Sequence, residues 1–201
     1  MHKKLHNLGK NTKTLIHTDI MITTSNKDNN DLWFALYASY PHMNEVKTLL
    51  DCNGIGYFTP MYHITILSDN KEYEKIYPAI SDMLFVRSTA DKIKQIVSQH
   101  NYLGFKLSFA NNVLSPIVIP ENDMLQLISA DKLNDGQVRY TCDNLHCANE
   151  ERVKIINGTF SGLEGTYINV SGLDKKRVII ATECITAILP AINPKYIEHI
   201  Q

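Results

Sequence analysis

The residues of this sequence best suited to chemistry are its four cysteines and eight histidines. Thiolates and imidazoles hold metal ions and act as nucleophiles or general bases. Cys142, His146 and Cys147 stand close together, an arrangement that suggests metal binding. Structural zinc sites join two closely spaced ligand pairs, and no second pair exists here, because Cys52 and Cys184 lie in apolar runs. We therefore predict no metal site and no cofactor.

Motifs of the common catalytic folds are missing from the sequence. It contains no phosphate-binding loop, no nucleophile elbow and no HExxH zinc-protease motif. Gly54 and Gly56 follow an expected helix, but the third glycine of a dinucleotide-binding fingerprint is absent. We predict that the protein is not an enzyme. The alternative is an enzyme whose site is assembled from residues without a sequence pattern.

The composition describes a globular chain with almost no net charge. Of the 201 residues 44% are hydrophobic, and 20 Lys and Arg stand against 21 Asp and Glu, which gives −1. Such a chain has no global field to attract nucleic acid, so that contact needs a local patch or a partner. The sequence has no apolar run of membrane-spanning length, no secretory signal and no disulfide framework. We therefore expect a cytoplasmic protein without membrane contact.

The elements that must position any functional side chain fall into two blocks, of which residues 31–130 form the first. Residues 1–30 before it are polar and predict a mobile tail. The first block predicts an α+β sandwich with an antiparallel sheet, in which the doubly apolar run 32–38 is a central strand. The polar stretch 68–74 predicts a loop, and residues 131–150 predict a linker. Further predictions are strands at 55–62, 83–86 and 117–119 and helices beginning near Met43, Thr89 and Glu121.

The second block, residues 151–201, predicts a small all-β barrel. β-branched runs recur at short intervals, and glycines separate them, a pattern typical of short strands joined by tight turns. No helical period is present in this block. The expected strands cover residues 153–156, 166–170, 177–182 and 185–189.

The segment 153–165 carries the most specific pattern in the chain. A strand leads into a tight turn at Asn157 and Gly158, where both residue types tolerate positive φ angles. Phe160 would fold back as an apolar plug, and Gly165 would let the chain re-enter the barrel. The segment resembles the KOW motif of NusG-family transcription factors and several ribosomal proteins. The alternative is a hairpin that begins a barrel of no particular family.

The resemblance to the NusG family extends upstream, keeps the domain order and covers residues 33–201. Ser81 and Asp82 replace the family's Pro-Gly pair, and Ile80 and Met83 replace the aromatic residues around it, which weakens an aromatic contact but not an apolar one. The stretch at residues 193–198 resembles the specialised UpxY-type branch, whose members act on capsular-polysaccharide operons. The segments that match upstream are 33–37, 54–61, 78–86 and 116–120.

The resemblance implies an N-terminal NGN-like domain that docks an apolar surface on the clamp helices of RNA polymerase. The matching positions are Tyr37, Ile80, Met83 and Phe85. A partner's apolar helix tip would meet them as a patch rimmed by aromatic side chains. The alternative for each residue is a place in the core, which we also expect for Trp33.

The resemblance implies a second partner for the C-terminal SH3-like KOW barrel. In the family this partner is a small ribosomal subunit protein or the termination factor Rho. The matching residues here are Asn157, Gly158, Phe160, Gly165 and Ile179. Phe160 has the alternative of a purely structural plug.

Specialised members of the family also contact the displaced non-template DNA strand. The polar candidates for such a contact here are His42, Lys47, Arg87 and Lys92. Each has the alternative of a solvated surface residue. Three basic groups are too few to bind DNA tightly unless polymerase holds the protein in place.

These features together predict a monomeric transcription elongation and antitermination factor. It would bind RNA polymerase and suppress pausing or termination at selected operons, such as those for surface polysaccharide synthesis. The first alternative is a general housekeeping NusG factor, which shares every one of these motifs. The second is a ribosome-associated KOW protein, and the near-neutral charge argues against it because proteins that bind ribosomal RNA are usually strongly basic.

Overall fold

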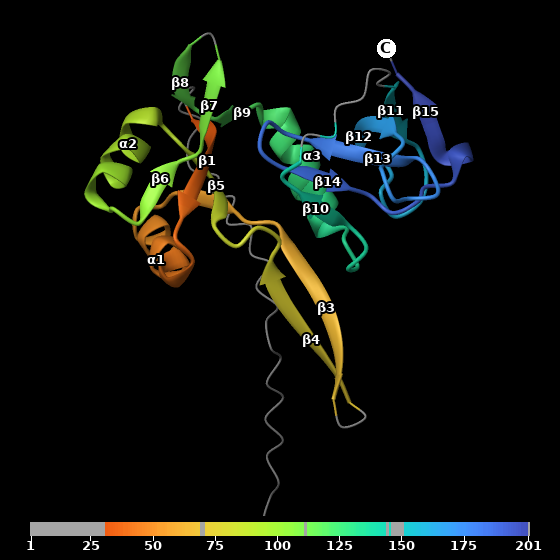
Figure 1. Ribbon diagram of the computed structural model, residues 1–201, viewed down its shortest axis with the longest axis horizontal. Helices are drawn as coiled ribbons and strands as arrows, with labels where there is room; N and C mark the ends of the chain where they lie inside the picture. The colour runs from red at the N-terminus through yellow and green to blue at the C-terminus, as the bar shows by residue number, and fades with distance from the viewer. Residues whose placement is uncertain (1–30, 69–70, 111, 144, 146–150, 201) are drawn as a thin grey trace, which may run out of the picture.

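The computed structural model describes residues 31–68, 71–110, 112–143, 145 and 151–200. Over this part of the chain it shows an N-terminal sheet with helices on both faces, a C-terminal all-β region and two projecting hairpins (Figure 1). The α+β class predicted from the sequence is confirmed. The predicted tail, residues 1–30, lies outside the described residues.

The N-terminal sheet is antiparallel and is built around its first strand. Its strands are β1 (Leu32–Ala38), β2 (Gly56–Phe58), β5 (Met83–Ser88), β6 (Leu103–Phe105) and β9 (Val118–Ile119). β1 pairs with β5 on one edge and with β6 and β9 on the other, and β2 pairs with β5. Phe34 and Leu36 of β1 belong to one core cluster, whereas Trp33 and Ala35 belong to another. The central position predicted for this strand is confirmed.

Two helices pack on one face of the N-terminal sheet and enclose a core cluster with it. α1 (Met43–Cys52) follows a short 3-10 helix at Tyr40–His42. α2 (Ala90–Gln99) begins where the Thr89 hydroxyl accepts a hydrogen bond from the backbone N–H of Lys92 at 3.4 Å. The members that α1, α2 and β1 contribute include Val46, Leu50, Ile93, Ile96, Phe34 and Leu36.

A third helix, α3 (Glu121–Lys132), lies between the N-terminal sheet and the C-terminal region (Figure 1). Its buried Met124, Leu127 and Ile128 belong to the same core cluster as residues of both regions. A hydrogen bond at 3.0 Å also joins the backbone N–H of Glu164 to the Gln126 side-chain oxygen. The two sheets therefore share one continuous core through α3.

The C-terminal region is a six-stranded antiparallel sheet in the order β10-β14-β13-β12-β11-β15. Its strands are β10 (Arg139–Thr141), β11 (Glu151–Ile155), β12 (Glu164–Ile168), β13 (Arg177–Ala181), β14 (Thr186–Ile188) and β15 (Ile197–His199), the last preceded by a 3-10 helix at Pro194–Tyr196. The four strands predicted from the β-branched runs correspond to β11 to β14. The structure differs from the predicted linker over 131–150, because β10 lies within that range and pairs with β14 of the C-terminal sheet. The two strands are far apart in the sequence, so the composition of residues 131–150 alone does not predict their pairing.

Two hairpins leave the N-terminal sheet. One joins β3 (Met61–Ser68) to β4 (Lys71–Pro78), and the other joins β7 (Leu107–Ala110) to β8 (Val113–Pro116). The prediction of a loop over 68–74 is wrong, since most of that stretch lies in β4. The hairpin is solvated along most of its length, so its polar residues give no burial signal. The single strand predicted over 55–62 is two strands, β2 and β3, interrupted near Pro60.

Candidate partner-binding surfaces

Of the four positions matched to a polymerase-binding surface, only two are accessible. Tyr37 pairs with Met83 across β1 and β5, and its side chain is 40% exposed. Ile80 is partly buried against the core that α3 shares with both sheets. Met83 is 3% exposed and Phe85 is fully buried inside that core. Met83 and Phe85 therefore lie under the surface and cannot contact a partner in this conformation. Trp33 is also buried, which confirms its predicted place in the core.

Polar groups border Tyr37. The Lys106 ammonium lies 5.5 Å from the centroid of the Tyr37 ring and 3.6 Å from a carboxylate oxygen of Asp82. A cation over the face of an aromatic ring is attracted by the ring's quadrupole, so Lys106 restrains the tyrosine on one side. The other part of the ring stays open to solvent. A restrained and exposed aromatic side chain with a polar rim is typical of an interface anchor.

The thiols near this surface are poorly suited to catalysis. Burial raises the pKa of Cys142 above its ordinary value and raises the pKa of Cys184 to about 11. Both thiols stay protonated near neutral pH, and a protonated thiol is a weak nucleophile and a weak metal ligand. His146 and Cys147 lie outside the described residues. Among the residues that are described, no group of three or more His, Cys, Asp or Glu side chains could hold a metal ion.

Two of the four candidates for DNA contact lie on the 3-10 helix and α1. His42 Nδ1 lies 3.0 Å from a carboxylate oxygen of Glu45, and the His42 ring stacks on Tyr102 with centroids 4.4 Å apart. Hydrogen bonds from His42 and then Tyr102 hold the pKa of Glu45 below its ordinary value. Lys47 is half-buried, and burial lowers the pKa of its ammonium. Internal contacts or partial burial thus limit what both residues offer to an anionic ligand.

The other two candidates for DNA contact are engaged within the chain. Arg87 lies 3.5 Å from a carboxylate oxygen of Glu121, and the Lys92 ammonium donates to the backbone carbonyl of Asn53 at 2.7 Å. The sequence cannot reveal such pairs, because the partners come from other elements. The structure does not assemble these four positions into one basic patch free of internal partners.

Of the residues matched to the KOW motif, Asn157, Gly158 and Phe160 lie in the turn after β11, Gly165 lies in β12 and Ile179 lies in β13. The Asn157 side-chain oxygen accepts a hydrogen bond from the backbone N–H of Gly158 at 2.7 Å, and Gly158 has a φ of +89°. Phe160 and Ile179 are each only 4% exposed. A Cβ added at Gly165 would overlap the backbone carbonyl oxygen of Ile179, so this glycine permits the close approach of β12 and β13. Of these residues, Asn157 and Gly158 in the turn are exposed and available to a partner.

A buried polar network joins α3, the β3–β4 hairpin and β10. The Asp131 carboxylate is 5% exposed and accepts hydrogen bonds from the Tyr140 hydroxyl at 2.6 Å and from the Met61 backbone N–H at 3.1 Å. The Tyr62 hydroxyl donates to the Tyr140 carbonyl and accepts from the Tyr140 N–H, both at 2.9 Å. Burial raises the pKa of Asp131, and its two hydrogen bonds oppose that rise. This network fixes the C-terminal sheet against the first part of the chain.

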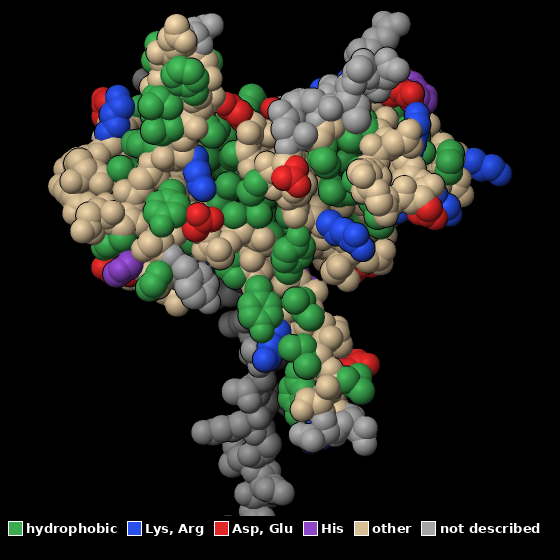
Figure 2. All heavy atoms as spheres, viewed as in Figure 1, with side chains coloured by type: hydrophobic (Ala, Val, Ile, Leu, Met, Phe, Trp, Pro, Cys, Tyr) green, Lys and Arg blue, Asp and Glu red, His purple; other side chains and the backbone are tan. Residues whose placement is uncertain are grey.

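The sequence interpretation missed the most exposed apolar side chains, which lie on the two hairpins. Figure 2 shows them gathered on the projecting parts of the molecule. The available signal was the alternation of Lys and Tyr with Glu and Ile over residues 71–77; the exposed apolar side chains themselves do not alternate, since Val113 and Leu114 are adjacent in the chain. On β7 and β8 they are Leu107, Phe109, Val113 and Leu114, and on β3 and β4 they are Ile64, Leu67, Tyr73, Ile76 and Tyr77.

Comparison with known proteins finds similarity to a family model and to solved structures. Residues 31–128 match the family model described as transcription termination factor NusG. One solved structure, titled "Domain interaction in Thermotoga maritima NusG", is 14% identical, covers 86% of this chain and 99% of its own, and has a TM-score of 0.39. No curated protein matches this chain. Within the described part of the chain, no helix is both long and apolar enough to cross a membrane.

Proposed function

We propose, from the match of residues 31–128 to the NusG family, that this protein is a transcription elongation and antitermination factor that binds RNA polymerase. The family match is the observation that carries the proposal. Residues 31–130 form the polymerase-binding domain, and residues 151–201 form a KOW barrel that recruits a second partner. The mechanism is binding rather than chemistry: preferential binding to the processive state of polymerase shifts its population away from pausing and termination.

In this proposal Tyr37 and Ile80 make the direct contact with the clamp helices of polymerase. The exposure of Tyr37 and the polar rim of Lys106 and Asp82 support this role. Met83 and Phe85 pack in the core and hold β5 in place next to this contact. An apolar anchor inside a polar rim is how protein interfaces concentrate their binding energy.

A binding experiment with the full chain tests this assignment. Tyr37→Ala should weaken binding to RNA polymerase of the native host by about tenfold or more, because the anchor is lost. Tyr196→Ala is the matched control, since that tyrosine is 36% exposed on the C-terminal region. The Tyr37 assignment is wrong if Tyr37→Ala binds like wild type while both variants unfold at the wild-type denaturant concentration.

The finer proposal is a specialised role at a few operons, such as those for surface polysaccharide synthesis. The resemblance of residues 193–198 to the UpxY-type branch supports it, and a general NusG factor is the alternative. Crosslinking in the native cells, mapped along the genome together with polymerase, separates the two. Occupancy confined to a few long operons supports the specialised role, whereas occupancy that follows polymerase over most genes supports the general one. Occupancy nowhere would overturn the proposed function itself.

A further inference from the structure

We propose that one face of the β3–β4 hairpin binds single-stranded nucleic acid, with Tyr73 and Tyr77 as stacking platforms and Lys71 and Lys75 as phosphate contacts. The inference goes beyond the proposed function, because this surface differs from the polymerase contact and from the four positions predicted for DNA. It also concerns the free protein and does not require polymerase.

The strand register divides the hairpin into two chemically different faces. Residues paired across an antiparallel ladder share a face, and the next pair lies on the other. One face, called here the lysine–tyrosine face, holds Tyr62, Ile64, Ile66, Lys71, Tyr73, Lys75 and Tyr77. The opposite face, called here the acidic face, holds His63, Thr65, Leu67, Glu72, Glu74 and Ile76. All the carboxylates of the two strands thus lie on one side, and all their ammonium groups lie on the other.

The two lysines are available to an anion. Both are exposed, and neither forms an ion pair with any residue that the structure describes. The acidic face, by contrast, has a partner of its own for one carboxylate, since Glu74 Oε1 lies 2.7 Å from His63 Nδ1. Among the described residues of the hairpin, this face therefore carries two ammonium groups and no carboxylate, although the net charge of the whole chain is −1. On the lysine–tyrosine face, those two groups are Lys71 and Lys75. A patch of this kind is what a near-neutral protein needs to contact nucleic acid.

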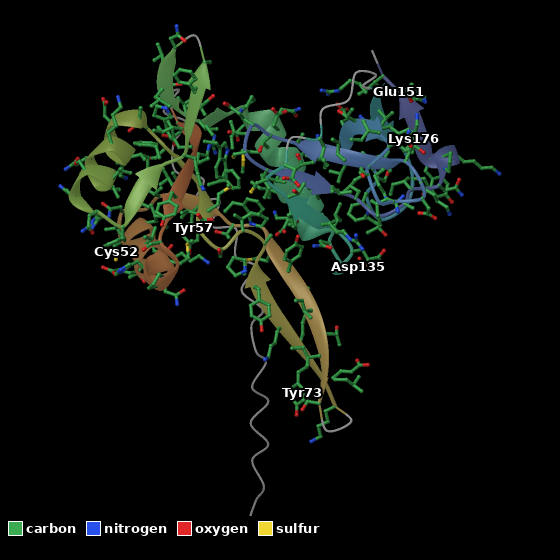
Figure 3. The ribbon with its side chains drawn as sticks, viewed as in Figure 1. Cys52, Tyr57, Tyr73, Asp135, Glu151 and Lys176 are labelled. Atoms are coloured by element: carbon green, nitrogen blue, oxygen red, sulfur yellow. The ribbon has the colours of Figure 1, made fainter. Side chains whose placement is uncertain are left out.

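The tyrosines are exposed and suitably spaced. Tyr73 is 48% and Tyr77 is 44% exposed, unlike the buried aromatic side chains of the core. With a strand rise of about 3.4 Å, the two lie roughly 14 Å apart, and Lys75 is midway between them. Figure 3 labels Tyr73 toward the tip of the hairpin, and Figure 2 shows hydrophobic and basic side chains next to each other along it. Aromatic platforms alternating with cations are how single strands are bound without sequence preference.

A single strand fits this face better than a duplex or a protein helix. A base must separate from its neighbouring bases before it can stack on a tyrosine ring, and only a single strand has bases in that state. An apolar helix is typically bound in a groove, whereas β3 and β4 form a separate two-stranded sheet that projects from the molecule (Figure 1). Two unpaired ammonium groups beside the rings would also stay without partners against an apolar helix.

The test uses the full chain and fluorescence anisotropy with mixed-sequence single-stranded DNA and RNA at low salt. Tyr73→Ala and Tyr77→Ala should each weaken binding by about tenfold, whereas Tyr73→Phe should bind like wild type because the ring is kept. A Lys71→Glu, Lys75→Glu double variant should weaken the salt dependence of binding: the magnitude of the slope of log affinity against log salt should fall by about 1.4 or more. Leu67→Ala, on the acidic face and 70% exposed, is the matched control and should change nothing.

Each outcome decides the proposal. If the tyrosine variants lose affinity equally for DNA and RNA, the face recognises the backbone and the stacking bases of either strand. If they lose affinity for one of the two alone, that nucleic acid is the ligand of the face. Equal affinity of all variants and wild type, with wild-type circular dichroism spectra, overturns the proposal. It is also overturned if the alanine variants keep oligonucleotide binding and lose polymerase, because the face is then a protein-docking surface. A normal polymerase titration with lost oligonucleotide binding leaves the proposed function intact.

Discussion

Replacing Tyr140 with Phe isolates the energy of the buried network between α3 and the C-terminal sheet. The substitution removes one hydroxyl and leaves Asp131 with the Met61 N–H as its remaining donor. The carboxylate is 5% exposed, so water does not replace the lost hydrogen bond. Hydrogen bonds to charged groups contribute about 1.5–3 kcal/mol, and we expect the free energy of unfolding to fall by about 2 kcal/mol near neutral pH.

The loss should depend on pH with a defined sign. Burial raises the folded-state pKa of Asp131, so the folded chain binds this proton more readily than the unfolded chain. Its contribution to stability is fully present below the ordinary carboxyl pKa and decreases as the pH rises through the raised value. The Tyr140 hydrogen bond lowers that pKa, so Tyr140→Phe should raise it further and extend the decrease to higher pH. The loss of stability should therefore be larger at about pH 8 than at about pH 4.5.

Urea unfolding of the full chain, followed by circular dichroism at both pH values, measures this effect. Tyr196→Phe is the control, because Tyr196 is 36% exposed and its loss should cost less than about 0.5 kcal/mol. Asp131→Asn keeps an acceptor for Tyr140 but removes the ionisation, so its stability should lack this pH dependence. The reasoning is refuted if Tyr140→Phe matches wild type within about 0.5 kcal/mol at both pH values, or if it is more harmful at the acidic one.

Three further substitutions test local features by the same urea unfolding. Gly165→Ala should destabilise the chain by more than about 2 kcal/mol, because its Cβ would overlap the Ile179 carbonyl oxygen, and Gly104→Ala should cost little because its Cβ would meet no atom within 4 Å. Phe160→Ala should cost about 3–5 kcal/mol, since it removes a side chain that is 4% exposed, and a cost under about 1 kcal/mol would contradict its burial. Thr89→Ala should cost about 1 kcal/mol by removing the N-cap of α2, and an unchanged midpoint would show that this cap contributes nothing.

Local chemistry is enough to predict the elements of the first block that carry an apolar period or a capping residue. β1 follows from a run that is apolar on both faces, and α2 follows from Thr89 and the spacing of Ile93 and Ile96. The end of α1 follows from Gly54, whose φ of +62° favours glycine. Each signal lies within a few residues of the structure it predicts, and the structure confirms them.

The hairpins show where that reasoning fails. The segment 71–77 alternates lysine and tyrosine with glutamate and isoleucine, so the strand period is present. Burial is absent on most of both faces, and a polar composition then predicts a loop. The segment is a strand because its backbone pairs with β3, and that pairing depends on the chain returning on itself.

The sequence by itself determined the α+β class, the central strand β1, the starts of the three helices and the likeness of the first block to the NusG family. The tertiary structure alone decided which candidate residues face solvent. Tyr37 and Phe85 belong to neighbouring strands of one sheet, yet one is 40% exposed and the other is fully buried. The period of a strand tells which residues share a face, but α3 decides which part of that face is covered. Accessibility is a property of packing between distant segments, and no single stretch of sequence contains it.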